Sequence, residues 1–262
     1  MNNYETILLD IDGDGVTRLT LNRVEVHNAM NAMFIAEMQD ALKVIEDSAE
    51  TRVVILTGAG ETFCAGGDLN WMKSNINKTR TQRVEETGEL ANMLAALDSL
   101  SKPLIGRIQG SAYGGGIGMM SVCDILIGVE GTNFGLTEVK LGLTPATISP
   151  YVVRRIGATN ARRNFFNARI FNAQEAQQMG LLTRVVEVEK LDEIIDQEIK
   201  LILKCAPGAI AATKKLIKYV DSHNDTENRS YTANALADAW DAAEGKEGID
   251  AFLNKRKAEW NK

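Results

Sequence analysis

Several residue types that reactive sites use are scarce in this sequence. Its 262 residues include three cysteines and two histidines. Cys64, Cys123 and Cys205 have no metal-ligand spacing and cannot all pair, which fits a reducing compartment. His27 and His223 stand in a loop-like segment and a polar turn, where a solvated imidazole is expected rather than the base of a catalytic triad. The sequence therefore predicts no metal centre and no histidine-dependent hydrolase.

The sequence also has no excess of positive charge and no long apolar run. The formal net charge is −6, which disfavours a nucleic-acid partner. No apolar run approaches the ~20 residues that a membrane span needs. The start, MNNYETILLDIDGDG, has neither the basic nor the apolar region of a signal peptide. We expect a cytoplasmic protein that does not bind membranes.

What the sequence does contain is an alternation of strand and helix patterns. This alternation predicts an α/β fold with crossover connections, in a core of residues 1–195. A hairpin is predicted at 6–23, helices at 32–48 and 80–100, and strands at 52–58, 103–110 and 124–130.

Strand patterns stop near residue 190, and the rest reads as helices. The predicted helical region is 196–262, with Pro207 near one helix start. Such a region either caps its own core or packs on a neighbouring subunit. Its apolar residues that need a partner surface include Leu236, Trp240, Ile249 and Phe252.

Glycine-rich segments follow two of the predicted strands, but neither matches a nucleotide-binding motif. Phe63 occupies the third glycine position of a dinucleotide fingerprint after Gly58 and Gly60, and Met119 occupies it in the second segment. No P-loop and no G-x-S-x-G nucleophile motif occurs. A Rossmann cofactor site and an α/β-hydrolase are therefore disfavoured.

The same two segments, 63–69 and 114–116, suggest a different chemistry. Each is a strand-to-helix turn, which leaves backbone N–H groups unpaired at the helix start. Small residues let a ligand oxygen approach those donors. Two N–H groups from separate turns make an oxyanion hole, worth about 3 kcal/mol per donor at a developing enolate.

Three motifs, FCAGGDL, IQGSAYGGGIGMMSVCDILIG and FGLTEVKLGLTP, are similar in order and spacing to the enoyl-CoA hydratase/isomerase (crotonase) superfamily. The resemblance covers nearly the whole chain. It implies a spiral of ββα units with a C-terminal helical trimerisation region, giving a homotrimer or a dimer of trimers. It also implies an acyl-coenzyme A substrate, with no cofactor beyond the coenzyme A of that substrate.

Site residues follow from the same resemblance. The N–H groups of Ala65 and Gly115 would hold the thioester oxygen, and Glu138 matches a catalytic glutamate of the hydratases. The segment 65–68 would line the pantetheine path, and the loop 23–29 would lie near the adenine end. The substrate-binding residues implied are Ala65, Gly66, Gly67, Asp68, Leu69, Gly115, Arg23, Val26 and Ala29.

One departure from the family pattern leaves the reaction open. Common hydratases carry a second glutamate where this chain has Gly118. The motifs most resemble the branch that hydrates 3-methylglutaconyl-CoA and carboxygeranoyl-CoA, which tolerates glycine there. A Δ3,Δ2-enoyl-CoA isomerase would use Glu138 alone. A dehalogenase is excluded because Ala146 replaces its nucleophilic aspartate.

Two further alternatives concern the charged groups. An acidic acyl chain would need a cationic partner, for which Lys73, Lys140, Arg154 and Arg155 are candidates against a solvated surface role, and Gly118 would leave space for it. A non-catalytic acyl-CoA-binding protein stays open if Glu138 is a salt-bridged structural residue.

Overall fold

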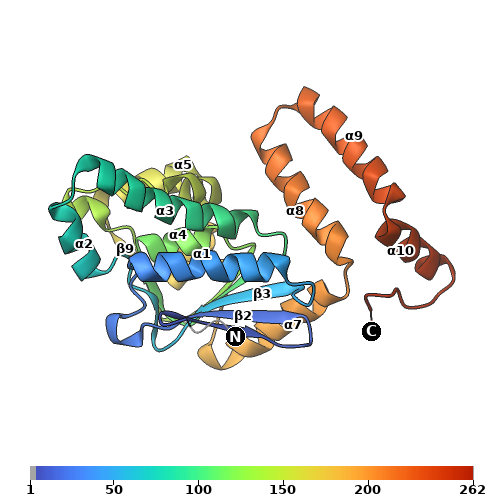
Figure 1. Cartoon of the computed structure of the whole chain (residues 1–262), viewed down its shortest axis with the longest axis horizontal. Coiled ribbons are helices and arrows are strands. Elements are labelled where there is room, and N and C mark those ends of the chain that lie inside the picture. The colour runs from blue at the N-terminus through green and yellow to red at the C-terminus, as the bar shows by residue number, and fades with distance from the viewer. Residues whose placement is uncertain (1–3, 262) are drawn as a thin grey trace.

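The computed structural model describes residues 4–261 and begins with the predicted hairpin (Figure 1). Strands β1 (Ile7–Ile11) and β2 (Val16–Leu21) pair antiparallel. In the turn between them, the Asp12 carboxylate accepts hydrogen bonds from the N–H groups of Asp14 at 3.1 Å and Val16 at 3.0 Å. The acidic side chains of this turn thus fix a backbone reversal.

The main sheet has six strands in the order β1-β2-β3-β5-β7-β10, with every pair after β1–β2 parallel. Its remaining strands are β3 (Val53–Gly58), β5 (Leu104–Ile108), β7 (Ile125–Val129) and β10 (Arg184–Val186). Successive residues of β3 face opposite sides: Val54 and Leu56 join the larger core cluster, and Val53 and Ile55 the smaller. Burial of both faces explains why this strand reads as an unbroken apolar run.

Helices cover both faces of this sheet. The larger core cluster includes buried residues of α1 (Ala32–Asp47), α3 (Arg80–Ser99) and α5 (Ser149–Asn167). The smaller cluster includes four buried residues of α7 (Leu191–Leu203) on the other face. The α/β prediction with crossover helices is confirmed.

A second sheet of three-residue strands was not predicted from the sequence patterns. It runs β4-β6-β8-β9, with β4 (Thr62–Cys64), β6 (Ser111–Tyr113), β8 (Asn133–Gly135) and β9 (Ile170–Asn172). Because β4 and β6 are parallel neighbours, their carboxyl ends lie at the same edge. The two glycine turns follow these ends and lead into α2 (Leu69–Ile76) and α4 (Gly115–Ser121). The ββα units that the resemblance implied are present, and they are arranged in two sheets.

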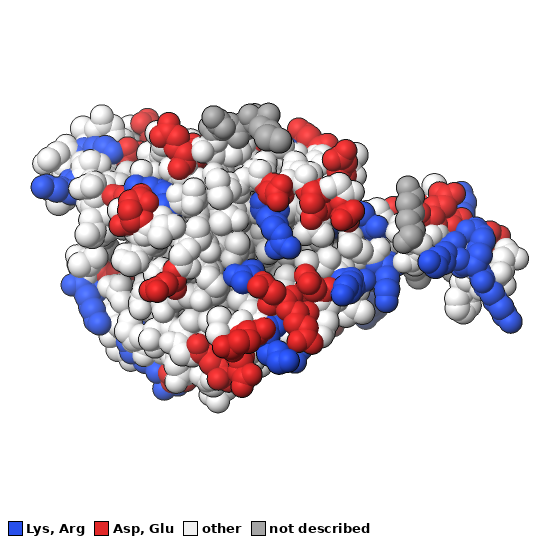
Figure 2. All heavy atoms as spheres, turned by 90° about the horizontal axis from the view of Figure 1, so that it is seen from below, with Lys and Arg blue, Asp and Glu red and all other residues white. Residues whose placement is uncertain are grey.

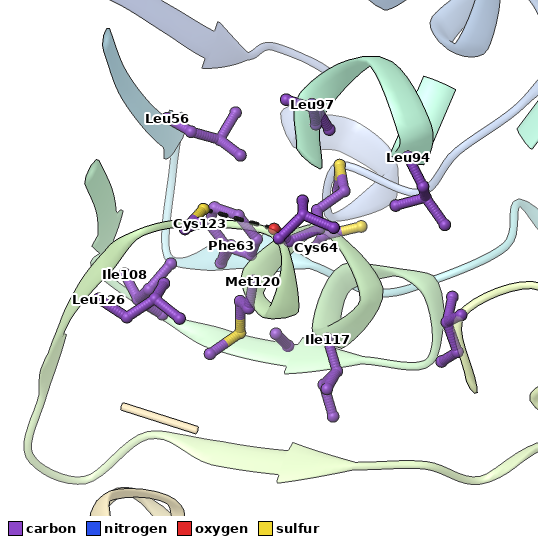
Figure 3. Packing of buried hydrophobic residues seen from close by; sticks show 14 of the residues in the cluster. Leu56, Phe63, Cys64, Leu94, Leu97, Ile108, Ile117, Met120, Cys123 and Leu126 are labelled. Atoms are coloured by element: carbon purple, nitrogen blue, oxygen red, sulfur yellow. Dashed lines mark hydrogen bonds between the residues drawn. The ribbon is translucent and has the colours of Figure 1, made fainter. Parts of the chain in front are cut away.

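Helix α4 is embedded in the core directly behind its glycine turn. In Figure 3, Ile117 and Met120 extend from one side of α4, Phe63 and Cys64 of β4 lie at another side, and Leu94 of α3 lies beyond them. All five side chains are buried. The second turn is therefore anchored by close packing on several sides.

The C-terminal helices α8 (Pro207–Ser222), α9 (Asp225–Asp241) and α10 (Ala243–Leu253) project away from this body (Figure 1). Figure 2 shows a narrow connection between body and projection, with acidic and basic side chains interspersed on the visible face. The expected boundary between residues 195 and 196 falls inside α7. Its C-terminal neighbour α8 contacts the body through Lys214, whose ammonium lies 2.7 Å from Asp124, and Lys218, 2.7 Å from Asp98.

The projecting helices leave large apolar side chains on the surface. Four of them are the residues singled out in the sequence, with Leu236, Trp240 and Phe252 more than half exposed. Pro207 occupies the first turn of α8, as expected. Within residues 4–261, no helix combines the length and apolarity that crossing a bilayer requires.

The remaining helices are short. They are α6 (Ala173–Gln178) and the 3₁₀ segments Val24–Val26, Glu138–Leu141 and Val188–Lys190. The segment Glu138–Leu141 follows β8 and carries the predicted catalytic glutamate at its first position.

Candidate active site

The loop of residues 23–30 is fastened to the first glycine turn. Arg23 forms an ion pair with Asp68 at 2.9 Å and donates a hydrogen bond to the carbonyl of Ala29. The fully buried Asn28 amide donates to the carbonyls of Ala59 at 2.9 Å and Thr62 at 2.8 Å. These contacts hold the predicted adenine-side loop beside the predicted pantetheine-side turn.

Asp68 has a structural role as well as its place in that turn. Its carboxylate caps α2 by accepting from the N–H groups of Asn70 and Trp71. Burial alone would raise the pKa of Asp68, but these two hydrogen bonds and the Arg23 guanidinium outweigh it and lower that pKa. Asp68 is therefore ionised at neutral pH, and its carboxylate is paired with Arg23 and with the start of α2.

Ala65 does not offer the N–H group that the sequence analysis assigned to it. That N–H donates to the carbonyl of His27 at 2.9 Å, so it is already engaged in fastening the loop. Two residues on, the N–H of Gly67 has no acceptor within residues 4–261. The prediction for Ala65 is corrected accordingly, and Gly67 is the available donor of the first turn.

The second turn begins at Gly114, which has φ 48° and ψ −116°, a conformation that side chains disfavour. Its own N–H donates to the carbonyl of Gly135 at 2.9 Å, which ties the turn to β8. In the next residue, Gly115, the N–H at the first position of α4 has no acceptor in the described chain. This turn thus supplies a second available donor.

The two turns lie against each other, and bare backbone is what allows this. Gly66 has φ 92°, and a Cβ on it would lie 3.1 Å from the carbonyl oxygen of Tyr113 and 3.9 Å from the Cα of Gly114. A larger residue would be strained by this φ and would crowd the carbonyl of Tyr113. Consequently, the donors Gly67 and Gly115 belong to two backbone segments in direct contact.

Glu138 lies at this junction. Its Oε1 would be 3.1 Å from a Cβ built on Gly114. Its Oε2 is buried and has no hydrogen-bond partner in the described part of the chain. Burial therefore raises the pKa of Glu138 above its ordinary value of 4.5. A salt-bridged, structural Glu138 is disfavoured, because its buried Oε2 has no partner among the described residues.

Space for a second acid at Gly118 is absent. A Cβ there would overlap Cγ2 of Ile148, lie 2.9 Å from its Cβ and reach 3.8 Å from Leu94. Ile148 is 3% exposed. The expectation that Gly118 leaves room for a substrate carboxylate or a water is wrong, because an apolar side chain fills that room.

Both candidate arginines already have partners within the described chain. Arg154 forms an ion pair with Asp98. Arg155 donates to the carbonyls of Gly180, Leu181 and Cys123, and burial lowers its pKa. Arg155 is thus held within the fold, whereas the Arg154 side chain is 42% exposed beside Asp98.

The other predicted site residues occupy varied environments. Lys73 on α2 and Lys140, two residues after Glu138, are exposed. Leu69, at the start of α2, is 81% exposed, whereas Ala29 is buried and Val26 half-buried. The structure brings the loop and both turns together. It leaves Leu69 on the surface.

Two residues at the site were not predicted from the sequence. Met30 packs its side chain on Gly115, where a Cβ would overlap Cε of Met30. Ile148 fills the space beside Gly118. Both are ordinary apolar residues, so no pattern in the sequence marked them.

Together these features form a site with two backbone donors and one carboxylate whose buried Oε2 has no partner among the described residues. Among residues 4–261 no group of three or more His, Cys, Asp or Glu could hold a metal ion. Such a site can polarise a carbonyl and move a proton nearby. It therefore belongs to the class that stabilises an oxyanion or enolate.

Comparison with known proteins identifies the family within this class of sites. Residues 12–262 match the family model for enoyl-CoA hydratase/isomerase. A short-chain-enoyl-CoA hydratase of Clostridium acetobutylicum is 32% identical over 97% of this chain and 96% of its own. The chain therefore belongs to the enoyl-CoA hydratase/isomerase family.

Solved structures agree with this assignment. An enoyl-CoA hydratase from Shewanella pealeana has a TM-score of 0.95 at 33% identity, covering 98% of this chain and 96% of that chain. The Pseudomonas aeruginosa protein AtuE has a TM-score of 0.94 at 34% identity, covering 98% and 100%. This protein therefore has the crotonase fold, which it shares with structures that are 33% and 34% identical in sequence.

Proposed function

We propose that this protein hydrates a 2-enoyl-CoA thioester. The observation that carries the proposal is the position of Glu138, whose Oε1 would lie 3.1 Å from a Cβ on Gly114, beside the Gly115 donor. Family membership and relatives named as enoyl-CoA hydratases support the substrate class.

In the proposed reaction, the N–H groups of Gly67 and Gly115 bind the thioester oxygen. Withdrawal of electron density toward that oxygen makes C3 electrophilic. As water adds to C3, negative charge develops on the same oxygen, where both donors bind it more strongly than in the ground state. Donors of this kind contribute about 3 kcal/mol each.

Glu138 moves the proton. Its carboxylate takes one proton from the attacking water while the water oxygen bonds to C3, and it then delivers a proton to C2 as the enolate collapses. The net change is addition of one water across the double bond. The raised pKa of Glu138 suits a group that must both accept and release a proton.

A purely binding role is disfavoured by the same residue. A buried polar oxygen without a partner costs about 1–3 kcal/mol. Oε2 of Glu138 is such an oxygen. A carboxylate kept at that cost beside two free donors supports catalysis over scaffolding.

A second candidate activity is Δ3,Δ2-enoyl-CoA isomerisation. Its specific support is the apolar contact of Ile148 with Gly118, which leaves a single acid at the site. Isomerisation requires one group to remove a proton from C2 and return it to C4, with no water to activate. Glu138 and the two donors suffice for that chemistry.

The narrower form of the hydratase proposal is an acidic acyl chain of the 3-methylglutaconyl type. Its support is the motif resemblance and the exposed Lys140, two residues from Glu138. Lys140→Ala should then lower turnover of 3-methylglutaconyl-CoA several-fold relative to crotonyl-CoA. If the wild-type protein turns over 3-methylglutaconyl-CoA and crotonyl-CoA equally well, the proposal of an acidic acyl chain is refuted. The proposal of a 2-enoyl-CoA hydratase is not affected by that result.

We also propose that the C-terminal helices assemble the chain into a trimer or a dimer of trimers. Leu236, Trp240 and Phe252 support this by exposing apolar surface that water disfavours. Light scattering at micromolar concentration should give three or six chain masses. A single chain mass would contradict it.

Glu138→Gln tests the chemistry of the site. This variant should bind coenzyme A thioesters as the wild type does and lose at least about 100-fold in kcat, the usual scale of a general base. A wild-type rate would remove Glu138 from the mechanism. Substrate panels of 2-enoyl and 3-enoyl thioesters, followed by product analysis, distinguish hydratase from isomerase.

A backbone pair of variants tests the corrected donor. Gly67→Pro deletes the N–H, and loss of one such donor lowers kcat by about 10²–10³-fold. Gly67→Ala keeps the N–H, and its Cβ would make an ordinary 3.5 Å contact with Met72, so it serves as the matched control. Equal kcat in the two variants would exclude Gly67 as a donor.

A further inference from the structure

Met30 contacts both turns of the site. Its backbone N–H donates to the carbonyl of Gly66 at 2.8 Å, and its carbonyl accepts from the N–H of Asp68 at 2.9 Å. These two bonds flank Gly67 and form a parallel bridge between Met30 and Gly67. The backbone of Met30 thus fixes the position of the first donor.

The side chain of the same residue contacts the second donor. Cε of Met30 occupies the position that a Cβ on Gly115 would need, and Met30 is 2% exposed. A glycine at 115 leaves its backbone without side-chain support of its own. The thioether chain of Met30 supplies packing there in its place.

Met30 itself is held in place by the preceding residues. His27 and Asn28 have φ 54° and 57°, and this left-handed pair turns the chain toward the site. The buried Asn28 side chain also accepts a hydrogen bond from the N–H of Arg23 at 2.9 Å. A strained loop secured by buried hydrogen bonds positions the residue that contacts both donors.

We propose that Met30 is a positioning residue that sets the distance between the donors Gly67 and Gly115. The inference rests on the proposed function, because the donors matter only if a carbonyl oxygen binds between them. The thioether of Met30 has no group that can exchange a proton with water or substrate. It acts through the geometry of the two N–H groups, which must match the oxyanion within a few tenths of an ångström.

Truncation of the side chain separates this role from simple core packing. Met30→Ala keeps both backbone bonds and removes the contact with Gly115. Met30→Leu keeps most of the volume and lacks the terminal methyl. Met38→Ala, at a fully buried methionine of α1 in the same core cluster, is the matched control for lost volume.

The measurements are kcat, KM and the absorbance of a bound 4-dimethylaminocinnamoyl-CoA. Hydrogen bonds to the thioester oxygen of this conjugated probe move its absorption to longer wavelength. Met30→Ala should lower kcat at least about tenfold, change KM less than threefold and reduce the absorbance shift. Met30→Leu should fall between Met30→Ala and wild type, and Met38→Ala should retain wild-type kcat and shift.

The possible results distinguish the positioning role of Met30 from the proposed hydratase function. Wild-type kcat and absorbance shift in Met30→Ala would overturn the positioning role, and so would an equal loss in Met38→Ala. If Met30→Ala does not fold, Met30→Leu carries the test, and a wild-type shift in it refutes the role. A wild-type protein that neither shifts the probe nor turns over any enoyl-CoA would instead refute the proposed function.

Discussion

Replacing Glu138 with glutamine should stabilise the folded protein near pH 8 and change its stability little near pH 4. Burial raises the pKa of Glu138 in the folded state above its ordinary value of 4.5. Between the unfolded and folded pKa values, the folded state therefore binds more protons than the unfolded state. The stability that the protonated carboxyl contributes is complete below the unfolded pKa and is lost as pH rises through the folded one.

The size of the gain follows from the environment of the carboxylate. Its Oε2 is buried without a partner, which costs about 1–3 kcal/mol. Because the residue is half-buried and glutamine also carries a polar group, the lower end applies, about 1 kcal/mol. For a chain of this size, that raises the unfolding midpoint by roughly 2–4 °C.

Glu46→Gln is a control of opposite sign. Burial alone would raise the pKa of Glu46, but hydrogen bonds from Ser101 and the nearby Lys102 outweigh it and lower that pKa. Glu46 therefore stabilises the fold at neutral pH, and that contribution disappears as pH falls through its lowered pKa.

Urea unfolding of both variants and wild type between about pH 4 and pH 8 gives the comparison. The gain from Glu138→Gln should grow with pH, and the loss from Glu46→Gln should grow with pH as well. A Glu138→Gln variant that is less stable than wild type at about pH 8, or equally more stable at both ends, would refute this account of the carboxylate.

The remaining predictions concern packing and charge. Gly118→Ala should lower the free energy of unfolding by about 1–3 kcal/mol through overlap with Ile148. Gly88→Ala, inside α3 with open space around it, should raise that free energy by about 0.5–1 kcal/mol in the same urea titration. Arg155→Ala should cost about 3 kcal/mol of stability because three carbonyls lose a charged donor. It should leave the ratio of acidic to neutral acyl-CoA turnover unchanged, and a changed ratio with full stability would restore Arg155 as a substrate ligand.

Long periodic elements were predictable, and very short ones were not. The helix predicted at 80–100 is α3, Arg80–Ser99, and the strand predicted at 52–58 is β3, Val53–Gly58. Strands β4 and β6 have three residues each, too few for an alternating pattern to be recognised. The second sheet was therefore not predicted, since the family resemblance implied ββα units but did not specify a separate sheet.

The residue types of the site could be predicted from the sequence, but the contacts of its individual atoms could not. Glycine turns and a downstream acid can be recognised in a sequence because their residue types are unusual. Which N–H group is free depends on tertiary contacts, and Ala65 is occupied only because the loop ending at His27 folds onto it. Likewise, the absence of a side chain at Gly118 says nothing about which neighbour takes the space.

The contact between Ile148 and Gly118 also affects how this site can evolve. A lineage gaining an acid at position 118 would first meet a filled core, and a lineage shrinking Ile148 first would open a cavity with no catalytic return. Each change is harmful alone and acceptable only beside the other, so their effects are not additive. An acid at position 118 would therefore require a smaller side chain at position 148, so packing as well as chemistry decides which acids this site can hold.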